Sequence, residues 1–426
     1  MWLRLAASAA LASASCTCVH ARTPAPFTLG EAFARVAESH PELRLFDARD
    51  ETLRAERDVA ALRPPLVAGA SVENALGSGD ARGLRSAEIS LTLASVLERG
   101  GKPEARRLLA QSRIDALGLE REAKRLDLLA EVARRYLTVV AAQREGEIAT
   151  LDAVQRRRSV EAAANRLHAG ASPESVLLTA QVALARAELD VARAAQRAEV
   201  ARQHLAALWG ERAPAFASAA GEPLALPPVP AFAQLADWLQ RTPEIARFAD
   251  EQRIREARLQ LARSTAMPDL DWQVGLRRLE ASDDYGLMAS VSIPLGASRR
   301  AEPAIRVAQT ELVALEVERE AKGLALHSTL VEADGRYRVA QLEVARLQEE
   351  VLPKLAAAET AAARAYRAGA TSYLEWAQLL SEHTATRRQQ LGAALDAQRA
   401  LIEIQRLTGH AFVAAGATQP DAGTSP

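Results

Sequence analysis

The spacing of apolar residues along this chain switches between a helical period and a period of two. A helical period begins at Thr28, a residue suited to capping a helix, and continues to about Arg63, where two prolines end it. The second half of the chain restarts in the same way near Phe232 and stops at Pro268. We therefore expect a helical stretch at the start of each half.

After each stop, apolar and polar residues alternate, as they do in strands that bury one face. The alternation covers about residues 66–93 in the first half and about 269–293 in the second. Each predicted strand has about 10 residues, the length with which a tilted strand crosses a bilayer. The apolar positions of the second hairpin are Leu270, Trp272, Val274, Leu276, Tyr285, Leu287, Ala289, Val291 and Ile293.

The four predicted strands cannot form a membrane structure within one chain. An isolated hairpin is marginally stable in water, and the smallest barrels that span an outer membrane have about eight strands. The open edges would have to pair with other copies of the chain, and three copies would close a barrel of twelve strands. For either hairpin taken alone, a soluble half-buried hairpin is the alternative.

Two long helical segments follow the two hairpins. From about Lys102 to Leu167 no proline occurs after Pro103, which predicts about 100 Å of helix. Its counterpart runs from about Ala304 to Tyr366, with Pro353 as the expected kink. Each segment then turns at a glycine and returns as a helix of roughly 37 residues, which Ser172 is predicted to cap in the first half. Helices this long with few bulky residues pack side by side.

The two halves also repeat each other in sequence. Glu120–Lys124 recurs letter for letter as Glu318–Lys322, and Leu167–Ser172 resembles Tyr366–Thr371. His40-Pro41-Glu42 likewise corresponds to Thr242-Pro243-Glu244, and Leu208-Trp209-Gly210 to Leu407-Thr408-Gly409. The pairs keep the same order, at separations of about 198 to 202 positions, which is far longer than a solenoid repeat. We predict one duplication, with two structural repeats at residues 22–210 and 232–412, a Pro-rich linker at 211–231 and a disordered tail at 413–426.

The first residues, 1–21, are typical of an export signal. A short positive start precedes an apolar run of small residues, and cleavage is expected after Ala21. Lipidation at Cys16 or Cys18 is the alternative. Cleavage after Ala21 would remove both cysteines, so the mature chain would hold no thiol and no disulfide.

Composition narrows the possible functions. Hydrophobic residues make up 49% of the chain but aromatic residues only 4%, so Ala, Leu and Val supply the apolar surface. The net charge of -1 argues against a basic surface for nucleic acid. No phosphate-binding loop, nucleophile elbow or zinc motif occurs, and the histidines lack metal-ligand spacing. We expect no catalysis, no cofactor and no bound metal.

A few aromatic and acidic residues are nevertheless candidates for a function. The turn that begins at Tyr366 is followed by Glu375, which in a ring of three copies would place carboxylates near the axis. Such a ring selects cations or forms a gate, whereas a surface acid near a helix N-terminus is the alternative. Trp272 and Tyr285 fit an aromatic belt at a membrane interface, with plain packing as the alternative.

From about Thr28 to Gly409 the chain resembles the TolC family of outer-membrane efflux channels. The duplicated halves, the two hairpins and the tip sequence Tyr366–Glu375 carry this resemblance. Leu97–Lys102 is similar to the Glu-x-Gly-Gly-Lys-Arg signature of the CzcC-like branch, which serves heavy-metal efflux pumps, and Pro103 stands where that signature has arginine.

The resemblance implies a mainly α-helical fold with a small β part, assembled as a homotrimer. Its strands would form a twelve-stranded barrel in the bacterial outer membrane, and its helices a long periplasmic tunnel. Glu375, Gln378 and Tyr366 match the family's periplasmic gate, and Val176 stands where the first repeat would have the equivalent of Glu375. The tips that would meet a periplasmic adaptor comprise Gly170, Ala171, Ser172, Gly369, Ala370 and Thr371.

The function implied is a passive exit duct, coupled through the adaptor to an inner-membrane pump of the resistance-nodulation-division type. Divalent heavy-metal cations are the expected cargo. Multidrug efflux and type I protein secretion are alternatives with the same architecture. A periplasmic coiled-coil scaffold without a pore is the alternative from another class, but it gives no reason for strands of membrane-crossing length.

Overall fold

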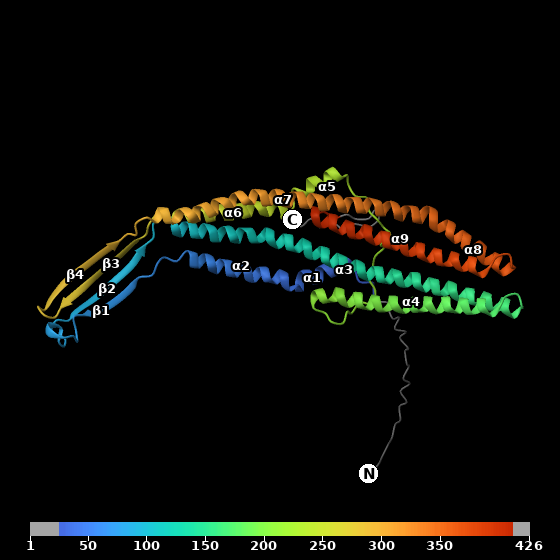
Figure 1. Ribbon diagram of the computed structural model, residues 1–426, viewed down its shortest axis with the longest axis horizontal. Coiled ribbons are helices and arrows are strands. Elements are labelled where there is room, and N and C mark those ends of the chain that lie inside the picture. The colour runs from blue at the N-terminus through green and yellow to red at the C-terminus, as the bar shows by residue number, and fades with distance from the viewer. Residues whose placement is uncertain (1–24, 412–426) are drawn as a thin grey trace, which may run out of the picture.

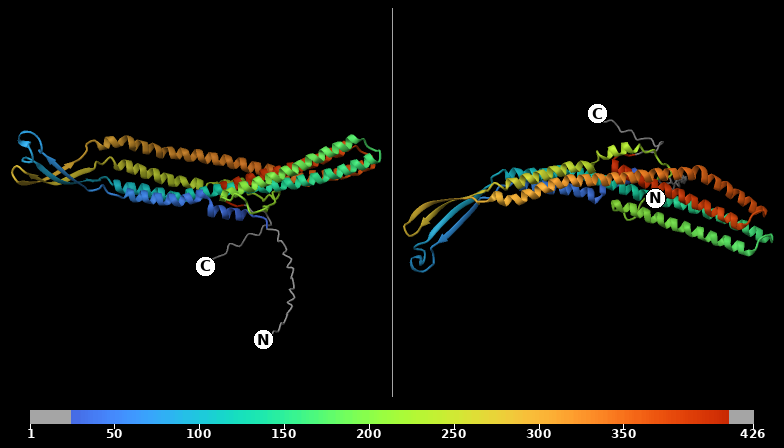
Figure 2. Two further views of the ribbon diagram at one scale, coloured as in Figure 1. Left: turned by 90° about the horizontal axis from the view of Figure 1, so that it is seen from below. Right: turned by 45° about the horizontal axis from the view of Figure 1, so that its top comes forward.

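The computed structural model describes residues 25–411. The chain is long, narrow and gently bent, with a four-stranded sheet at one end and two helical hairpin tips at the other (Figures 1 and 2). The predicted signal peptide with Cys16 and Cys18, and nearly all of the predicted tail, lie outside the described residues. Within residues 25–411, no helix is both long and apolar enough to cross a membrane.

The same order of elements occurs in both halves: two helices, a hairpin, a long helix and a return helix. The first half consists of α1 (Leu29–Ser39), α2 (Pro41–Ala60), β1 (Val67–Glu73), β2 (Glu88–Leu97), α3 (Lys102–His168) and α4 (Glu174–Ala206). The second half consists of α5 (Phe232–Leu239), α6 (Pro243–Ser264), β3 (Leu270–Leu279), β4 (Asp284–Ser292), α7 (Ala297–Arg346), α8 (Leu352–Ala368) and α9 (Tyr373–Thr408).

The opening helical stretch of each half is interrupted, which the periodicity did not predict. In the first half the helix ends before His40, whose backbone is extended, and a new helix starts at Pro41. The ring of a proline disfavours a helical conformation in the residue before it, and proline suits the first turn of a helix. The His40 Nδ1 atom accepts a hydrogen bond from the Glu42 backbone N–H at 3.2 Å, so this side chain caps α2.

The second long helix differs from its prediction at its start and in its interior. It begins earlier, at Ala297, with Pro303 inside it. Close to Pro353, where a kink is expected, a π-helical turn at Leu347–Val351 interrupts the α-helix. A π turn accommodates one extra residue in a helix. This explains why the repeated segments before the turn are separated by 198 positions, whereas the tips after it are separated by 199.

The four strands form one antiparallel sheet in the order β1-β2-β3-β4. The β2 strand extends to Leu97, past the expected end of the first hairpin, and Ile293 lies one residue beyond β4. Residues that pair directly lie on the same face of a sheet. The register therefore places one set of apolar residues on a single face, namely Ala68, Ala70, Val72, Ile89, Leu91, Leu93, Trp272, Val274, Leu276, Tyr285, Leu287, Ala289 and Val291.

Two hydrophobic clusters in the middle of the molecule, one around Tyr136 of α3 and one around Tyr337 of α7, hold the long helices against the linker. Both tyrosines are buried, and each hydroxyl donates a hydrogen bond to a linker carbonyl. The Tyr136 hydroxyl donates to Ala220, and the Tyr337 hydroxyl to Pro227. Burial raises the pKa of each tyrosine to about 12. The irregular linker is thus held against both helices.

Candidate functional site

Both tips close with the same backbone turn. Gly170 and Gly369 have φ of +68° and +82°, a left-handed conformation that glycine adopts without strain. The next residue in each tip donates back into the helix, Ala171 to Arg166 O at 2.9 Å and Ala370 to Ala365 O at 2.8 Å. The predicted tip residues therefore lie together at the end of the molecule opposite the sheet (Figure 1).

The two tips differ in how their return helices begin. Ser172 does not cap α4, contrary to prediction: Pro173 occupies the cap position, without a side-chain hydrogen bond. In the second tip, the Ser372 hydroxyl accepts from the Glu375 backbone N–H at 3.2 Å. The Thr371 hydroxyl donates to the Glu375 carboxylate. The second tip thus holds the acidic side chain of Glu375 by a hydrogen bond at its turn.

The predicted gate residues do not lie in one cluster. Glu375 and Gln378 are exposed in the first turns of α9, whereas Tyr366 is only 2% exposed. The Tyr366 ring packs against Tyr373 and Trp376, with ring centroids 5.9 and 5.3 Å away. Tyr366 thus belongs to the hydrophobic core of the tip, and the exposed polar positions are on the neighbouring helix.

Arg166 joins the two tips, which sequence reasoning missed. Its guanidinium donates to Tyr366 O at 2.5 Å and to Ala171 O at 3.1 Å, and lies 5.0 Å from the centre of the Tyr366 ring. The only signal in the sequence was an arginine four residues before the tip glycine. The side chain can reach the second hairpin only because α3 and α8 end at the same level.

Several buried polar atoms at the tips have no hydrogen-bond partner among the described residues. They are Arg166 Nε, Trp376 Nε1 and the hydroxyls of Tyr366 and Tyr373. Buried polar groups in folded proteins are normally paired, by the protein, by water or by a partner. Arg166 and Trp376 also line a cavity of about 800 Å³ between the two hairpins. The tips thus carry unused hydrogen-bonding capacity.

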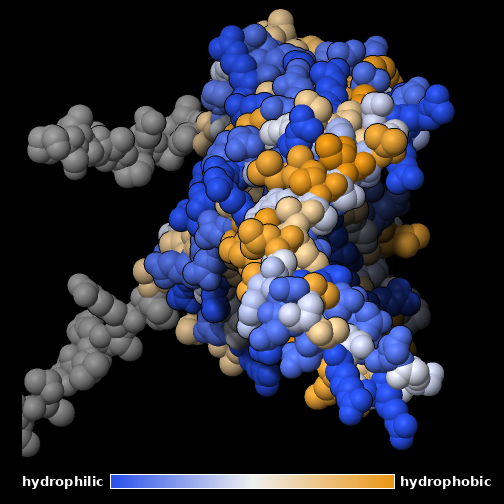
Figure 3. Space-filling model, turned by 90° about the vertical axis from the view of Figure 1, so that its left-hand side faces the viewer, coloured by the Kyte–Doolittle hydropathy of each residue, from blue (hydrophilic) through white to orange (hydrophobic). Residues whose placement is uncertain are grey.

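The two aromatic residues predicted at a membrane interface lie on the apolar face of the sheet. Trp272 is near the helical end of β3, and Tyr285 is at the far end of β4. Tyr285 is exposed and lies 5.7 Å from the Arg278 guanidinium. Figure 3 looks onto this end of the molecule and shows apolar residues gathered between hydrophilic ones. The two aromatic residues are therefore at opposite ends of the apolar face.

The segment Leu97–Lys102 forms the corner between β2 and α3. Gly100 has φ of +74°, and a Cβ atom there would lie 2.7 Å from Met267 Cβ, so only glycine fits. Lys102 Nζ lies 2.6 Å from Asp269, which also accepts from the Arg99 backbone. Pro103 lies in the first turn of α3, where proline is tolerated. This segment therefore holds the connection between β2 and α3 against the connection between α6 and β3, where Asp269 lies.

Glu98 of the same segment pairs with Arg106 one turn into α3. The Glu98 carboxylate accepts from Arg106 at 2.5 and 2.9 Å, and this hydrogen bond lowers the pKa of Glu98 despite partial burial. Arg106 also donates to the carbonyls of Ala60 and Leu62 at the end of α2. The corner therefore holds the first helical stretch in place as well.

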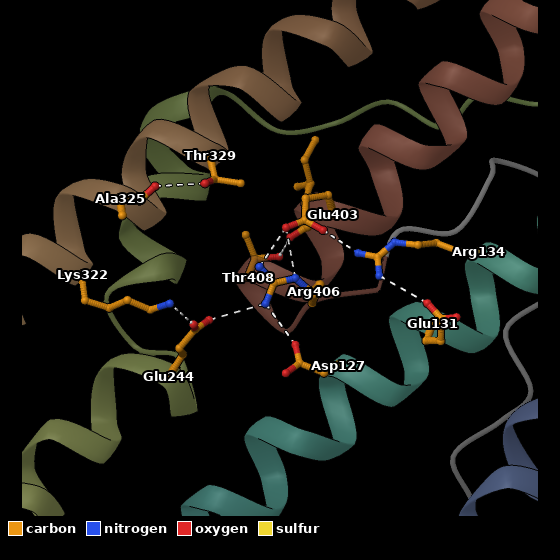
Figure 4. Close-up of polar contacts among 11 residues, drawn as sticks. Asp127, Glu131, Arg134, Glu244, Lys322, Ala325, Thr329, Glu403, Arg406 and Thr408 are labelled. Carbon is orange, nitrogen blue, oxygen red and sulfur yellow. Dashed lines mark hydrogen bonds and ion pairs between the residues drawn. The ribbon is translucent and has the colours of Figure 1, made fainter. Parts of the chain in front are cut away.

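A network of ion pairs joins the two halves near the middle of the molecule (Figure 4). Arg406 of α9 contacts Glu403 at 2.8 Å, Asp127 of α3 at 3.1 Å and Glu244 of α6 at 3.6 Å. Glu403 also accepts from Arg134 of α3 at 2.7 Å. Burial favours the neutral form of Arg406, but the hydrogen bonds and charges of its carboxylate partners raise its pKa. The network ties α3 to the second half.

No three His, Cys, Asp or Glu side chains within residues 25–411 converge as the ligands of a metal ion would.

Comparison with known proteins gives consistent matches along the chain. Residues 33–211 and 235–410 match the family described as "Outer membrane efflux protein". The cobalt-zinc-cadmium resistance protein CzcC of Cupriavidus metallidurans is 30% identical over 313 residues, which cover 74% of this chain and 75% of CzcC.

Solved structures share the fold. A crystal structure of CusC has a TM-score of 0.74 at 18% identity, and the match covers 89% of this chain and 91% of CusC. The open state of the MtrE outer membrane channel of Neisseria gonorrhoeae has a TM-score of 0.71 at 19% identity, with 89% and 88% covered.

Proposed function

Because this chain belongs to the outer membrane efflux protein family and is an outer-membrane efflux channel, we propose that it exports divalent heavy-metal cations as a homotrimer. Channels of this family work with an adaptor and an inner-membrane pump in tripartite systems. This membership also excludes the pore-free scaffold considered from the sequence. The energy for export would come from the pump, and the channel would supply a water-filled path.

The sheet supports the trimeric assembly. Within the chain, β1 and β4 each have one unpaired edge, and exposed edges are normally covered or paired. If β4 of one copy paired with β1 of the next, three copies would close a barrel of twelve strands. The apolar face would contact lipid, with Trp272 and Tyr285 at the two interfaces. The opposite face, which carries Ser90, Thr92 and Arg277, would line the lumen.

The tips support the assignment of a gate and an adaptor contact. In a trimer, three copies of Glu375 and Gln378 would face the narrow end of the tunnel, and carboxylates there attract cations. The unpaired polar atoms around Tyr366 and Trp376 would be satisfied by an adaptor or by movement of the tips. The duplication at residues 22–210 and 232–412, joined by the linker 211–231, gives each copy one of each tip.

The observation that carries the cargo assignment is the 30% identity to CzcC over 74% of the chain. The experiment is to delete the gene in its host and to measure retained zinc, cobalt and cadmium, together with sensitivity to a panel of organic drugs. The deletion strain should retain several-fold more metal, and the wild-type chain should restore export.

Two variants separate the gate from general damage to a tip. Glu375→Ala should alter metal export because it removes the acidic ring. Glu174→Ala is the matched control, since it removes an exposed acid from the first turn of the other return helix. Unchanged metal with increased drug sensitivity would assign the channel to multidrug efflux. No change in either would reject both cargoes and favour protein secretion.

A further inference from the structure

The four connections between the helices and the sheet lie together at one end of the sheet (Figure 1). They are residues 61–66 between α2 and β1, 98–101 between β2 and α3, 265–269 between α6 and β3, and 293–296 between β4 and α7. Strands of about 10 residues have the length to cross a bilayer. If the sheet spans the outer membrane as proposed, these connections lie at the periplasmic surface of the membrane, among the lipid headgroups.

This level of the molecule is basic. Residues 62–66, 98–107, 263–269 and 293–302 contain eight basic and four acidic residues, a net charge of +4, whereas the whole chain has a net charge of -1. The loops at the opposite end of the sheet, residues 74–87 and 280–283, contain two basic and three acidic residues. Positive charge is therefore concentrated at the helical end of the sheet.

Most of these basic side chains have no partner. Lys102 pairs with Asp269, and Arg106 pairs with Glu98. The other six are exposed arginines, and within residues 25–411 their side chains make no hydrogen bond or ion pair. We call these six the basic belt: Arg63, Arg99, Arg107, Arg263, Arg299 and Arg300.

Part of the belt lies where a helix disfavours positive charge. Arg299 and Arg300 are in the first turn of α7, which contains no acid, and Arg99 directly precedes the start of α3. The N-terminus of a helix carries a partial positive charge and favours anions. Neither α3 nor α7 has a side chain that caps its N-terminus. An anion from outside the chain would stabilise both the arginines and the helix ends.

Large apolar side chains are exposed at the same level. Leu295, four residues before Arg299, is 89% exposed. Long basic side chains that extend from an apolar surface toward a charged layer are typical of a membrane–water interface. Each of the four connections contributes to this set of exposed apolar residues, which comprises Leu62, Leu66, Leu97, Met267, Ile293 and Leu295.

We propose that the basic belt binds the phosphate groups of anionic phospholipids in the periplasmic leaflet of the outer membrane. The inference rests on the proposed membrane-spanning assembly and names the lipid class that it recognises. The planar guanidinium group of arginine binds phosphate through two parallel hydrogen bonds. Basic residues near a membrane surface attract anionic lipids. The exposed apolar residues of the connections would contact the acyl chains next to those headgroups.

The proposed cargo favours the lipid side of the barrel for the belt. Arginines that faced the lumen would repel divalent cations at the entrance to the barrel. Apolar residues that faced the lumen would stay in contact with water, whereas on the lipid side they are removed from it. Charge and hydrophobicity therefore both favour the outside of the barrel.

Trp272 provides a local reporter of the lipid beside the belt. It lies near the helical end of β3, on the apolar face of the sheet, whereas Trp209, Trp238 and Trp376 lie outside the sheet. The full-length channel is placed in bilayers of phosphatidylglycerol and phosphatidylcholine, of which either one or the other carries brominated acyl chains. Quenching of Trp272 fluorescence then measures which lipid binds there. We expect several-fold preferential binding of phosphatidylglycerol at low salt, and loss of this preference at high salt because exposed charges are screened.

Two sets of substitutions separate the belt from a general effect of charge. The belt variant should lose most of the preference, and it combines Arg99→Gln, Arg107→Gln, Arg299→Gln and Arg300→Gln. The control variant should keep the preference of the wild type. It replaces four exposed arginines that also have no side-chain partner within residues 25–411 but lie on the helices away from the sheet: Arg44→Gln, Arg158→Gln, Arg186→Gln and Arg319→Gln.

The possible results distinguish the belt from the assembly on which it rests. Trp272→Phe should abolish the quenching, which identifies the reporter. Equal quenching by the two lipids in the wild type, or an unchanged preference in the belt variant, would overturn the belt and leave the sheet in the membrane. No quenching of Trp272 by either lipid would reject the membrane-spanning sheet itself. The salt dependence of the wild type tests the belt even if the belt variant does not fold.

Discussion

Single residues give the two repeats their different roles although the backbone turn is the same. Gly170 and Gly369 make equivalent left-handed turns. The side chains that follow differ: Val176 packs into the hydrophobic core of the tip, whereas Glu375 is exposed and hydrogen-bonded to Thr371. At these corresponding positions, the second tip therefore has an exposed acid where the first tip has a packed apolar residue.

Two of the repeated sequence segments contact each other in each half. Lys124 lies 2.9 Å from Glu42, and Lys322 lies 2.7 Å from Glu244. The same Lys-Glu ion pair therefore joins the two repeated segments in each half. Arg406 adds a second cation to Glu244. The first half has no such addition, and this difference creates the network that binds the halves together.

The stability of this network should depend on pH. Burial alone would raise the pKa of the Glu403 carboxyl, but hydrogen bonds and charge from Arg406 and Arg134 outweigh it and lower the pKa. A carboxyl whose pKa is lower in the folded state stabilises the fold above its unfolded pKa, and the contribution is lost as pH falls through the folded pKa. We therefore expect thermal unfolding temperatures to fall on acidification below the ordinary carboxyl range.

Glu403→Gln should isolate this contribution. At neutral pH it should lower the free energy of unfolding by about 1–3 kcal/mol, because Arg406 and Arg134 lose a charged acceptor. Its stability should also fall less steeply with acidification. Glu382→Gln, an exposed acid on the same helix, is the control. If Glu403→Gln kept the pH dependence of the wild type, the assignment to this carboxyl would be wrong.

At the scale of elements, the π turn keeps the two halves in register. The segments on either side of Leu347–Val351 pack as their counterparts in α3 do, although the second half has one more residue between the repeated segment at Glu318 and the tip glycine Gly369 than the first half has between Glu120 and Gly170. Without the turn, the extra residue would rotate everything after it by about 100° around the helix axis. The tip aromatic residue Tyr366 would then leave the hydrophobic core in which it packs.

Deleting one residue tests this role. Removing Glu349 should convert the π turn to α-helix and change the free energy of unfolding by less than about 1 kcal/mol, because the flanking residues keep their faces. Removing the exposed Thr150, at the corresponding place in α3, should cost at least about 3 kcal/mol because buried residues such as Ala163 would turn outward. Thermal unfolding of both variants provides the comparison, and equal losses would contradict the account.

At the scale of the whole molecule, each end of the chain is incomplete alone. The sheet has two unpaired edge strands and a broad apolar face. The α7 helix has a row of exposed apolar residues, Leu324, Val331 and Val339. The tips have unpaired buried polar atoms. These three features lie along the full length of the molecule (Figure 1). An assembly of several copies would satisfy the first two, and a partner at the tips the third.

The direction in which the sheet faces can be tested with two adjacent residues. Leu287 is 91% exposed on the apolar face, and Met288 points to the opposite face. Leu287→Arg should destabilise the protein in lipid by about 2–4 kcal/mol, because it places a charge near the middle of the bilayer. Met288→Arg should cost much less. Folded protein in outer-membrane extracts measures both, and a larger loss for Met288→Arg would reverse the assignment of the faces.

The periodicities determined the elements of this fold. The four strands, the first long helix and both tips lie within a few residues of their predicted places, because local sterics and the burial of one face act over short stretches. The second long helix begins seven residues earlier than predicted, at Ala297. The breaks at Pro41 and Pro243 show the limit of periodicity. The apolar spacing continues across a break that the proline ring imposes on the backbone.

The tertiary structure alone decided which distant groups meet. Arg166 reaches Tyr366 O across 200 residues, and Arg406 reaches Asp127 across 279. No sequence spacing predicts such contacts, because they depend on how long helices align and on which face each turns to its neighbour. The sequence thus determined the repeated elements and their tips. The packing of the helices determined that Arg166 of the first tip binds the second tip, and that ion pairs around Arg406 join the two halves.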